Sequence, residues 1–405
     1  MPAIEIRPDI YWIGVNDRTT DLFEGMWPIT EEGVSYNSYL ILDEKKALID
    51  ITRNTQEANL LAQLQGRLDC HELDYIVVNH MEPDHTGALR VLRSLAPQAT
   101  ILCSAKAQAM LKDYYGITDN VQVVADGETL SLGKHQLQFH MIPFVHWPET
   151  MATYETTEKV LFSCDAFGGY GALRGSIFDD QAVDLAHYER EALRYYVNIV
   201  ARFSQPTLNA IKKLGGIEIA VVAPSHGLIW RRDTKRIIEL YRQWALLATN
   251  QPDPGVTLIY GSMYGNTEAM MNAVAQGISR AGVPVEIFNA ARTHASYILP
   301  SVWTHSGVMI GAPTYEVGLF TPMAEQLRYI IEKRISNRKA AFFGSYGWSG
   351  GALKTAKQLV EPLKWEWVET LEFQGRATLE QLAEGEAFGY RFAESLKPQQ
   401  GVIPQ

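Results

Sequence analysis

A short segment of this sequence carries four side chains that can bind a metal ion. The segment reads NHMEPDHTG from residue 79, and the four candidates are His80, Glu82, Asp84 and His85. In an extended loop, side chains two residues apart can point the same way, whereas the residue between them points elsewhere. The spacing therefore favours two metal ions rather than one. The alternative is a polar turn before a helix with Asp84 as its N-cap, although a cap needs only one such residue.

Three further candidate ligands come later in the chain, each near the carboxyl end of an expected strand. They are His146, Asp165 and His226. Ligands of α/β folds collect at that end of the strands. A lone histidine at a strand end is more often structural, so these three depend on the first cluster for support. The remaining histidines of this region lack such a context, and we expect them to be surface residues without a role: His71, His135, His140 and His187.

The run HxExDH, followed by His, Asp and His at these separations, resembles the metallo-β-lactamase-fold domain of flavodiiron proteins (A-type flavoproteins). The usual zinc hydrolases of that fold carry HxHxDH, and Glu82 replaces the second histidine here. A carboxylate is a harder ligand than imidazole and favours iron, whereas an all-histidine set suits zinc. The resemblance implies two irons bridged by Asp165, with His80, Glu82 and His146 on one iron and Asp84, His85 and His226 on the other.

A second group of candidate residues opens a helix directly after the expected strand at 256–260. The group comprises Ser262, Met263, Tyr264, Gly265, Asn266 and Thr267. Hydroxyls and free backbone N–H groups at a helix N-terminus can bind a phosphate dianion. This loop does not contain the dinucleotide fingerprint GxGxxG. It is similar to the FMN phosphate site of flavodoxins, with Tyr264 where Thr is commoner, and an ordinary helix cap is the alternative.

Two more loops at expected strand ends place aromatic side chains beside glycines. One contributes Pro313, Thr314, Tyr315 and Gly318, and the other contributes Ser345, Tyr346, Gly347, Trp348 and Gly350. Glycine lets the backbone approach a flat ring closely, and an aromatic side chain can stack on that ring. We therefore expect Tyr315 and Trp348 to stack on a flavin rather than to pack in a core.

Two domains are expected to position these residues. The chain has 405 residues, of which 46% are apolar and 20% charged, as in a globular protein. That length predicts about two domains. The segment 250–255 reads NQPDPG, and its prolines and glycine cannot continue a helix or join a central strand. The sequence thus predicts a metal-binding domain over 1–250 and an FMN-binding domain over 251–405.

The first domain is expected to be an αββα sandwich of the metallo-β-lactamase kind, with mixed sheets inside and helices outside. Strands are predicted at 4–15, 75–78, 99–104, 121–124, 136–142, 151–154, 160–163 and 219–223, with a hairpin over 36–50. Helices are predicted at 58–68, 87–95, 105–115 and 184–202.

The second domain shows strands alternating with helices, which predicts a flavodoxin-like doubly wound parallel sheet of five strands. The strands are predicted at 256–260, 285–289, 307–311, 340–344 and 366–373. The helices are predicted to begin near Thr267, Met323, Gly351 and Thr378.

Charge and composition exclude several classes of partner. The net charge of −10, without a cluster of Lys and Arg, argues against nucleic acid and anionic membranes. No apolar run approaches the ~18–20 residues of a membrane span, and the N-terminus does not resemble a secretion signal. A cytoplasmic protein is therefore expected. Three scattered cysteines exclude a disulfide framework and a Cys₄ metal centre within the chain.

The resemblance implies a flavodiiron reductase, in which FMN passes electrons to a diiron site that reduces O₂ to water, NO to N₂O, or both. It also implies a head-to-tail homodimer, or a tetramer built from such dimers. Without a Cys₄ site or an NAD(P) fingerprint the chain needs an external electron donor, with rubredoxin expected first and a reduced deazaflavin second. Two alternatives stay open: a zinc hydrolase of the metallo-β-lactamase fold fused to a flavodoxin electron-transfer domain, and an electron carrier with a vestigial metal domain.

One departure from the family pattern lies early in the chain. Some relatives have a pocket histidine there, whereas this sequence reads LFEGMWP from Leu22. The sequence leaves open the roles of Trp27, Tyr195 and Tyr196 near the pocket. It also leaves open the preference between O₂ and NO.

Overall fold

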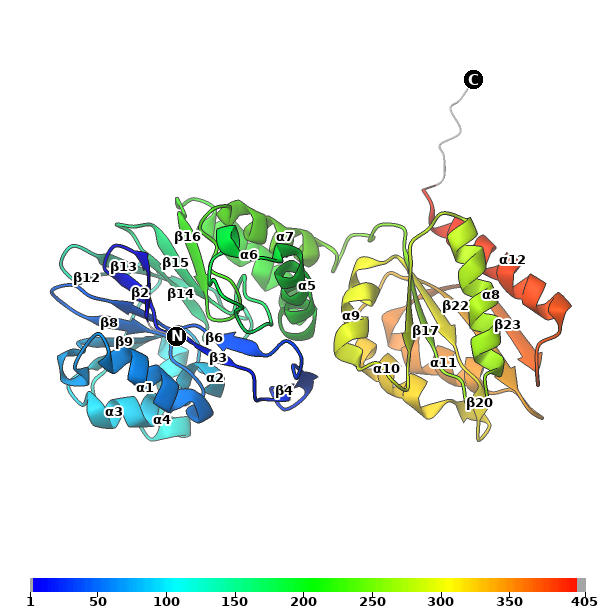
Figure 1. Ribbon diagram of the computed structural model, residues 1–405, viewed down its shortest axis with the longest axis horizontal. Helices are drawn as coiled ribbons and strands as arrows, with labels where there is room; N and C mark the ends of the chain where they lie inside the picture. The colour runs from blue at the N-terminus through cyan, green and yellow to red at the C-terminus, as the bar shows by residue number, and fades with distance from the viewer. Residues whose placement is uncertain (1–2, 399–405) are drawn as a thin grey trace, which may run out of the picture. The chain divides into compact units, whose positions relative to one another are not determined.

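The computed structural model describes residues 3–398 and divides into two compact units, Met1–Ala245 and Leu246–Gln405 (Figure 1). The division falls at the end of helix α7 (Thr234–Leu246), a few residues before the proline-containing segment 250–255.

Two β-sheets form the centre of the first unit. The larger sheet has seven strands, in the spatial order β1 (Ile4–Arg7), β2 (Ile10–Trp12), β7 (Tyr39–Ile41), β8 (Ala47–Ile49), β9 (Tyr75–Val78), β10 (Thr100–Cys103) and β11 (Val121–Val123). The smaller sheet has five, in the order β12 (Thr129–Ser131), β13 (Gln136–Met141), β14 (Met151–Glu155), β15 (Val160–Cys164) and β16 (Val221–Pro224). Both sheets mix parallel and antiparallel pairs.

The two sheets pack face to face, and helices cover their outer faces. The rings of Tyr39 on β7 and Phe162 on β15 meet with centroids 5.0 Å apart. On the larger sheet, buried leucines come from helices α1 (Glu57–Gln65), α3 (Leu89–Leu95) and α4 (Ala105–Tyr115). Helices α5 (Leu185–Tyr195), α6 (Ser204–Leu214) and α7 lie on the opposite side (Figure 1). The layers follow the αββα order, which confirms the predicted fold class of this domain.

The prediction of one strand over residues 4–15 is wrong. The chain turns at Asp9, whose φ is 64°, and β2 runs back antiparallel to β1 with Trp12 opposite Ile4. Pro8 precedes the turn and has no N–H to continue a strand ladder. The hairpin predicted over 36–50 is present as β7 and β8, with Tyr39 opposite Ile49.

Several elements of the first unit are not predicted from the sequence. They are the helices α6 and α7 and the short strands β3 (Val15–Asp17), β4 (Leu22–Phe23), β5 (Trp27–Pro28) and β6 (Val34–Tyr36). The helix predicted over 184–202 changes character part-way, because α5 is followed by a π-helical turn, Tyr196–Val200. The helix predicted over 87–95 begins at Leu89, and the residues before it form a separate short helix, α2 (Pro83–Thr86).

The second unit is a five-stranded sheet in which every neighbouring pair of strands is parallel. The spatial order is β18 (Val285–Asn289), β17 (Val256–Tyr260), β19 (Gly307–Gly311), β22 (Lys339–Tyr346) and β23 (Glu366–Gln374). In chain order this is 2-1-3-4-5, the flavodoxin-like arrangement, so the predicted fold class is confirmed here too. A two-stranded ribbon, β20 (Thr314–Tyr315) and β21 (Gly318–Leu319), lies outside the sheet.

Helices flank the parallel sheet: α8 (Asn266–Arg280), α9 (Ala295–Thr304), α10 (Thr321–Glu332), α11 (Ala352–Val360) and α12 (Leu379–Leu396). The sequence does not predict α9, which contains Pro300. Helices α8 and α12 pack with their backbones in close approach. A side chain at Gly277 would collide with the carbonyl oxygen of Glu386, and one at Gly389 would collide with that of Val274. Glycine is therefore required at this crossing.

Candidate metal centre and flavin pocket

The first four predicted ligands lie around a tight turn that follows β9. His80 comes two residues after the last residue of β9, and Glu82 is the N-cap of α2. The segment is not the extended loop expected from the sequence, because Pro83 starts a short helix that carries Asp84 and His85. Proline suits a first helical position, since its fixed φ is already helical and no N–H is lost.

The other three predicted ligands come from loops after strands of the smaller sheet. His146 lies in the loop after β13, Asp165 directly follows β15, and His226 lies just past β16. The structure thus brings together side chains from four separate strand ends.

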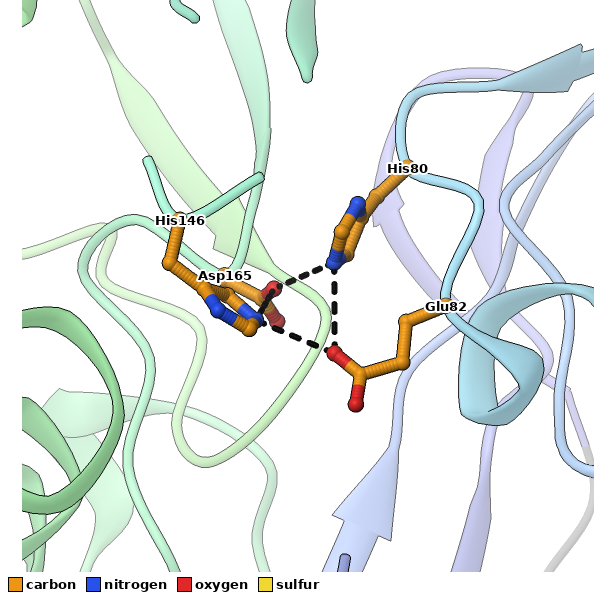
Figure 2. Close-up of side chains that lie close together, drawn as sticks. All are labelled: His80, Glu82, His146 and Asp165. Atoms are coloured by element: carbon orange, nitrogen blue, oxygen red, sulfur yellow. Dashed lines mark hydrogen bonds and ion pairs between the residues drawn. The ribbon is translucent and has the colours of Figure 1, made fainter. Parts of the chain in front are cut away.

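One group of ligand atoms gathers around Oε2 of Glu82 (Figure 2). Nε2 of His80 lies 3.3 Å from this oxygen, and Nε2 of His146 lies 3.0 Å from it. Oδ2 of Asp165 is 3.4 Å from the first nitrogen and 3.3 Å from the second. One ligand atom from each of these four residues lies within 4.8 Å of every other.

A second group gathers around the carboxylate of Asp84. Its Oδ1 lies 3.4 Å from Nε2 of His85, and its Oδ2 lies 3.3 Å from Nε2 of His226. Oδ1 of Asp165 lies 3.1 Å from the His85 nitrogen and 3.4 Å from the His226 nitrogen. The two oxygens of Asp165 therefore face two different groups, each with two imidazole nitrogens and one further carboxylate.

The donor atoms of this cluster fit metal ions, because many of them are buried without a hydrogen-bond partner. These atoms are both carboxylate oxygens of Asp84, Oδ2 of Asp165, and Nε2 of His85 and His226. Buried polar atoms in proteins are normally hydrogen-bonded, so each exception calls for an explanation. Ions placed between these atoms would provide it. Two nitrogens, one carboxylate and a shared carboxylate around each ion suit non-haem iron.

The electrostatics of the cluster also call for cations. Burial would lower the pKa of His146, but the carboxylates of Asp165 and Glu82, 3.3 Å and 3.0 Å from its Nε2, raise it to about 10. Burial is likewise outweighed at His226, where Asp165 and Asp84 raise the pKa to about 9. Against its burial, the pKa of Asp165 is held well below its usual range by His85 first, and by His146 and His226 as well. Without metal, the carboxylates retain protons on the imidazoles, and metal binding would release these protons.

Three contacts behind the ligands fix their orientation. Nδ1 of His80 lies 2.7 Å from Oε1 of Glu149, and Nδ1 of His226 lies 2.8 Å from the backbone oxygen of Ser35. The hydroxyl of Tyr195 donates to Asp165. Such outer contacts set the tautomer and basicity of metal ligands. Sequence reasoning missed Glu149, because a single acidic residue after a loop carries no pattern.

The structure shows which contacts are made by Tyr196 and Trp27, whose roles the sequence left open. Tyr196 turns away from the cluster, and its hydroxyl is 2.8 Å from that of Ser204. Nε1 of Trp27 donates to Glu24 over 3.1 Å. Glu24 lines a cavity of about 280 Å³ whose wall also contains the candidate ligands Glu82 and Asp84.

One of the histidines expected at the surface is instead buried. The prediction for His135 is wrong, because its side chain is fully buried and Nδ1 lies 3.1 Å from Oε1 of Glu155, which is equally buried. His71 is exposed, and His140 and His187 are half-buried. The pair of His135 and Glu155 lies outside the ligand cluster.

The predicted flavin loops meet around one cavity of about 400 Å³. Twelve predicted residues line it: Ser262, Met263, Tyr264, Asn266, Thr267, Pro313, Thr314, Tyr315, Ser345, Tyr346, Gly347 and Trp348. Glu316 and Gly375 also line it and were not predicted. Three predicted glycines are not among its lining residues: Gly265, Gly318 and Gly350. Gly265 instead turns the chain into α8 with a φ of 87°, and Gly318 pairs with Tyr315 in the two-stranded ribbon.

The side chains around this cavity have the properties expected of a flavin site. The hydroxyl oxygens of Thr267 and Ser345 lie 2.9 Å apart and join two of the three loops. Tyr264 and Trp348 are 90% and 82% exposed, so neither packs in the core of this chain. Aromatic rings left open beside a cavity are suited to stacking on a planar ligand.

Comparison with protein families finds two matches, one in each unit. Residues 34–227 match the family described as "ODP family beta lactamase", and residues 258–388 match "Flavodoxin". The anaerobic nitric oxide reductase flavorubredoxin of Salmonella arizonae is 36% identical over 94% of this chain and 80% of its own length. The nitric oxide reductase of Moorella thermoacetica is 35% identical over 90% of this chain and 91% of its own.

Solved structures give the same result over both units. Rubredoxin oxygen:oxidoreductase from Desulfovibrio gigas superposes with a TM-score of 0.91 at 30% identity, covering 97% of this chain and 98% of that one. The flavodiiron protein from Giardia intestinalis superposes with a TM-score of 0.91 at 28% identity, covering 98% and 97%.

Fold and comparisons together define an oxidoreductase with a metallo-β-lactamase-like and a flavodoxin-like domain. The chain belongs to the flavodiiron proteins. Within residues 3–398, no helix combines the length and the apolar character needed to cross a bilayer.

Proposed function

We propose that the protein is a reductase of O₂ to water, of NO to N₂O, or of both, with FMN and a non-haem diiron site as its cofactors. The relatives described as nitric oxide reductases and as a rubredoxin oxygen:oxidoreductase support this function. The observation that carries the proposal is the position of Asp165, whose two oxygens face two groups of equal composition.

In this proposal each group of side chains holds one iron. His80, Glu82 and His146 would hold the first, Asp84, His85 and His226 would hold the second, and Asp165 would serve both. When bound, the flavin would exchange one or two electrons and the irons would offer coordination positions to a diatomic ligand. The domains that provide these sites would span residues 1–250 and 251–405.

The cavity beside the metal cluster favours a small substrate. Its volume of about 280 Å³ lies just below the roughly 300–1,000 Å³ of pockets for drug-sized ligands. Its wall contains Glu82 and Asp84 together with Glu24, Tyr36 and Arg53. Such a cavity has ample room for a diatomic gas.

The partners of the reaction follow from the same proposal. We expect an external donor, rubredoxin first and a reduced deazaflavin second. We also expect a head-to-tail homodimer, or a tetramer of such dimers. A cytoplasmic location is supported by three cysteines that are all free, Cys70, Cys103 and Cys164.

Metal analysis and rapid mixing test the function. Anaerobically purified protein should hold two irons and one FMN per chain, and after reduction it should be reoxidised by O₂, by NO, or by both. The two rates would show the preferred gas. Two zinc ions and no iron would overturn the proposal in favour of a hydrolase.

A single substitution separates a reductase from an electron carrier. Asp165→Ala removes the side chain shared by both groups, so turnover with either gas should be lost while the FMN content stays at the wild-type level. Full turnover in this variant would contradict a bridged diiron site and support the carrier.

A further inference from the structure

The two groups of metal ligands differ in what lies behind their imidazole rings. Behind His80 is the carboxylate of Glu149, with Oε1 2.7 Å from Nδ1. Behind His226 is the backbone oxygen of Ser35, 2.8 Å from Nδ1. The first contact brings a full negative charge to the ring, whereas the second brings only a peptide dipole.

The geometry around Glu149 determines which nitrogen of His80 carries its proton. The backbone N–H of Met81 donates to the same oxygen, Oε1, over 3.0 Å, so this oxygen is an acceptor. Nδ1 of His80 must therefore be the donor, which leaves Nε2 as the nitrogen that faces Glu82 and Asp165. The ring is thus held in the tautomer that a metal requires.

Glu149 is built into the structure rather than placed at the surface. Its side chain is fully buried, as is that of His80. Its backbone oxygen accepts a hydrogen bond of 2.7 Å from Oγ of Ser104, the N-cap of α4. A buried carboxylate that is held at both its backbone and its side chain can orient a ligand with little freedom.

The other group has a buried carboxylate nearby, but that carboxylate is engaged elsewhere. Asp50 lies close enough to His85 to influence its pKa. Both oxygens of Asp50 nevertheless accept hydrogen bonds from other residues, Oδ1 from the backbone of Asn79 and Oδ2 from the side chains of Asn79 and Ser225. Direct support of an imidazole by a carboxylate is therefore seen at His80.

We propose that Glu149 is a positioning residue that makes the metal position of His80, Glu82 and His146 the tighter of the two. A carboxylate behind a metal-bound imidazole fixes the ring and increases its electron donation to the metal. The iron at this position is held more firmly than the iron at Asp84, His85 and His226. This inference rests on the proposed function, because it presupposes two irons in these positions.

The test measures iron affinity rather than turnover. Glu149→Gln keeps the shape and an acceptor oxygen but removes the charge. Glu155→Gln is a matched control, because Glu155 is equally buried and contacts Nδ1 of His135 in the same unit, away from the ligand cluster. Full-length proteins loaded anaerobically with ferrous iron are titrated with a ferrous chelator. E149Q should release one of its two irons at a chelator concentration about 10–100-fold lower than wild type, whereas E155Q should release none early.

Mössbauer spectra show which iron is released. Asp84→Asn weakens the other position, so the doublet lost early from D84N should differ from the doublet lost from E149Q. The double variant, E149Q combined with D84N, should lose both doublets early. The proposal is overturned if E149Q holds both irons as wild type does, releases both together, or loses the same doublet as D84N.

A second variant and the wild-type protein distinguish failure of this inference from misfolding and from failure of the proposed function. If E149Q does not fold, Glu149→Asp is used, which keeps the charge but shortens the side chain. The same iron should then be released early, with a smaller shift, and an unshifted titration overturns the proposal. Failure of the proposed function looks different, because the wild-type protein itself would then bind no pair of irons.

Discussion

The hydroxyl of Tyr195 donates a hydrogen bond of 2.9 Å to Oδ1 of Asp165. Tyr195 is the last residue of α5, and the π-helical turn Tyr196–Val200 begins directly after it. Single π-helical turns within helices are frequent at functional sites. Here the two adjacent tyrosines point to different surroundings, since the hydroxyl of Tyr196 meets that of Ser204 instead.

Tyr195→Phe removes a buried donor from the carboxylate that faces both ligand groups. The change should lower turnover with O₂ or NO by about 10–100-fold, the usual effect of losing an outer partner of a metal ligand. Steady-state gas consumption with an electrode, normalised to iron content, measures it. Unchanged turnover per iron would show that this hydrogen bond has no part in the reaction.

Tyr196→Phe is the control for that variant. It removes a hydrogen bond to a neutral hydroxyl, worth about 1 kcal/mol, and leaves Asp165 untouched. The midpoint of urea unfolding should fall slightly while turnover per iron stays at the wild-type level. Equal losses of turnover in both variants would point to general disruption of this helix.

Trp348→Ala should weaken FMN binding without destabilising the chain. Trp348 is 82% exposed and lines the flavin cavity, so it contributes little to the core. Stacking of aromatic rings contributes about 0.5–1.5 kcal/mol, which corresponds to a dissociation constant for FMN about 2–13-fold higher. Fluorescence titration of the apoprotein with FMN measures the change.

Trp365→Phe should show the opposite pattern. Trp365 is buried, and its Nε1 donates to the backbone oxygen of Ile335 over 2.8 Å. Its replacement should lower the free energy of unfolding by about 1 kcal/mol or more and leave FMN affinity unchanged. A loss of FMN affinity as large as that of W348A would argue against stacking by Trp348.

The buried pair of His135 and Glu155 should give stability a specific pH dependence. The hydrogen bond to Glu155 raises the pKa of His135 above its usual 6.5. Burial opposes ionisation of Glu155, but its hydrogen bonds lower its pKa below the usual 4.5. The contribution of His135 to the free energy of unfolding is complete below pH 6.5, and it is lost as the pH rises through the folded-state pKa of His135. The contribution of Glu155 to the free energy of unfolding is complete above pH 4.5, and it is lost as the pH falls through the folded-state pKa of Glu155.

Both contributions are therefore present together between about pH 4.5 and 6.5. In that window Glu155→Gln should lower the free energy of unfolding by about 1–3 kcal/mol, and the loss should shrink on either side. Urea unfolding of wild type and E155Q at a series of pH values measures the difference. Asp43 and Lys134 also act on His135, so a difference independent of pH would show that they set its charge instead.

Gly389→Ala should destabilise the flavodoxin-like domain. The added methyl would collide with the backbone of Val274 where α8 and α12 cross, and the helices would have to separate. Such overpacking costs about 1–3 kcal/mol. Gln276→Ala, at an exposed site on α8, is the control and should change stability little. Thermal unfolding followed by FMN release measures both, and equal stability of G389A and wild type would contradict the close approach.

The regular elements could be predicted because residues close to their ends in the sequence determine where they begin and end. Helix α4 matches its predicted range, 105–115, since Ser104 caps its start and Gly116 ends it in the left-handed conformation. Strands β17, β18 and β19 also match, as short apolar runs bounded by turn residues. The short strands β3 to β6 have two or three residues each, too few to show a period-two pattern. Helix α9 was not predicted because it contains Pro300, and proline normally indicates the end of a helix.

The gathering of the seven candidate ligands could be predicted, because four of them share one short segment and made the later three recognisable. Their partners could not. Glu149 and Ser35 are defined only by contact with His80 and His226, and those contacts join segments far apart in the chain. The prediction that His135 lies at the surface was wrong for the same reason, because its partner Glu155 lies on the neighbouring strand.

Ser104 links the backbone of Glu149 to the first turn of a surface helix. Its Oγ accepts the N–H of Ala107 as a cap and donates to the backbone oxygen of Glu149. Opening the first turn of α4 would thus release the segment that holds His80 in place. Amide hydrogen exchange at Ala107 should slow when iron is bound and quicken when it is removed. A peptide far from any ligand in sequence would then report the occupancy of the centre.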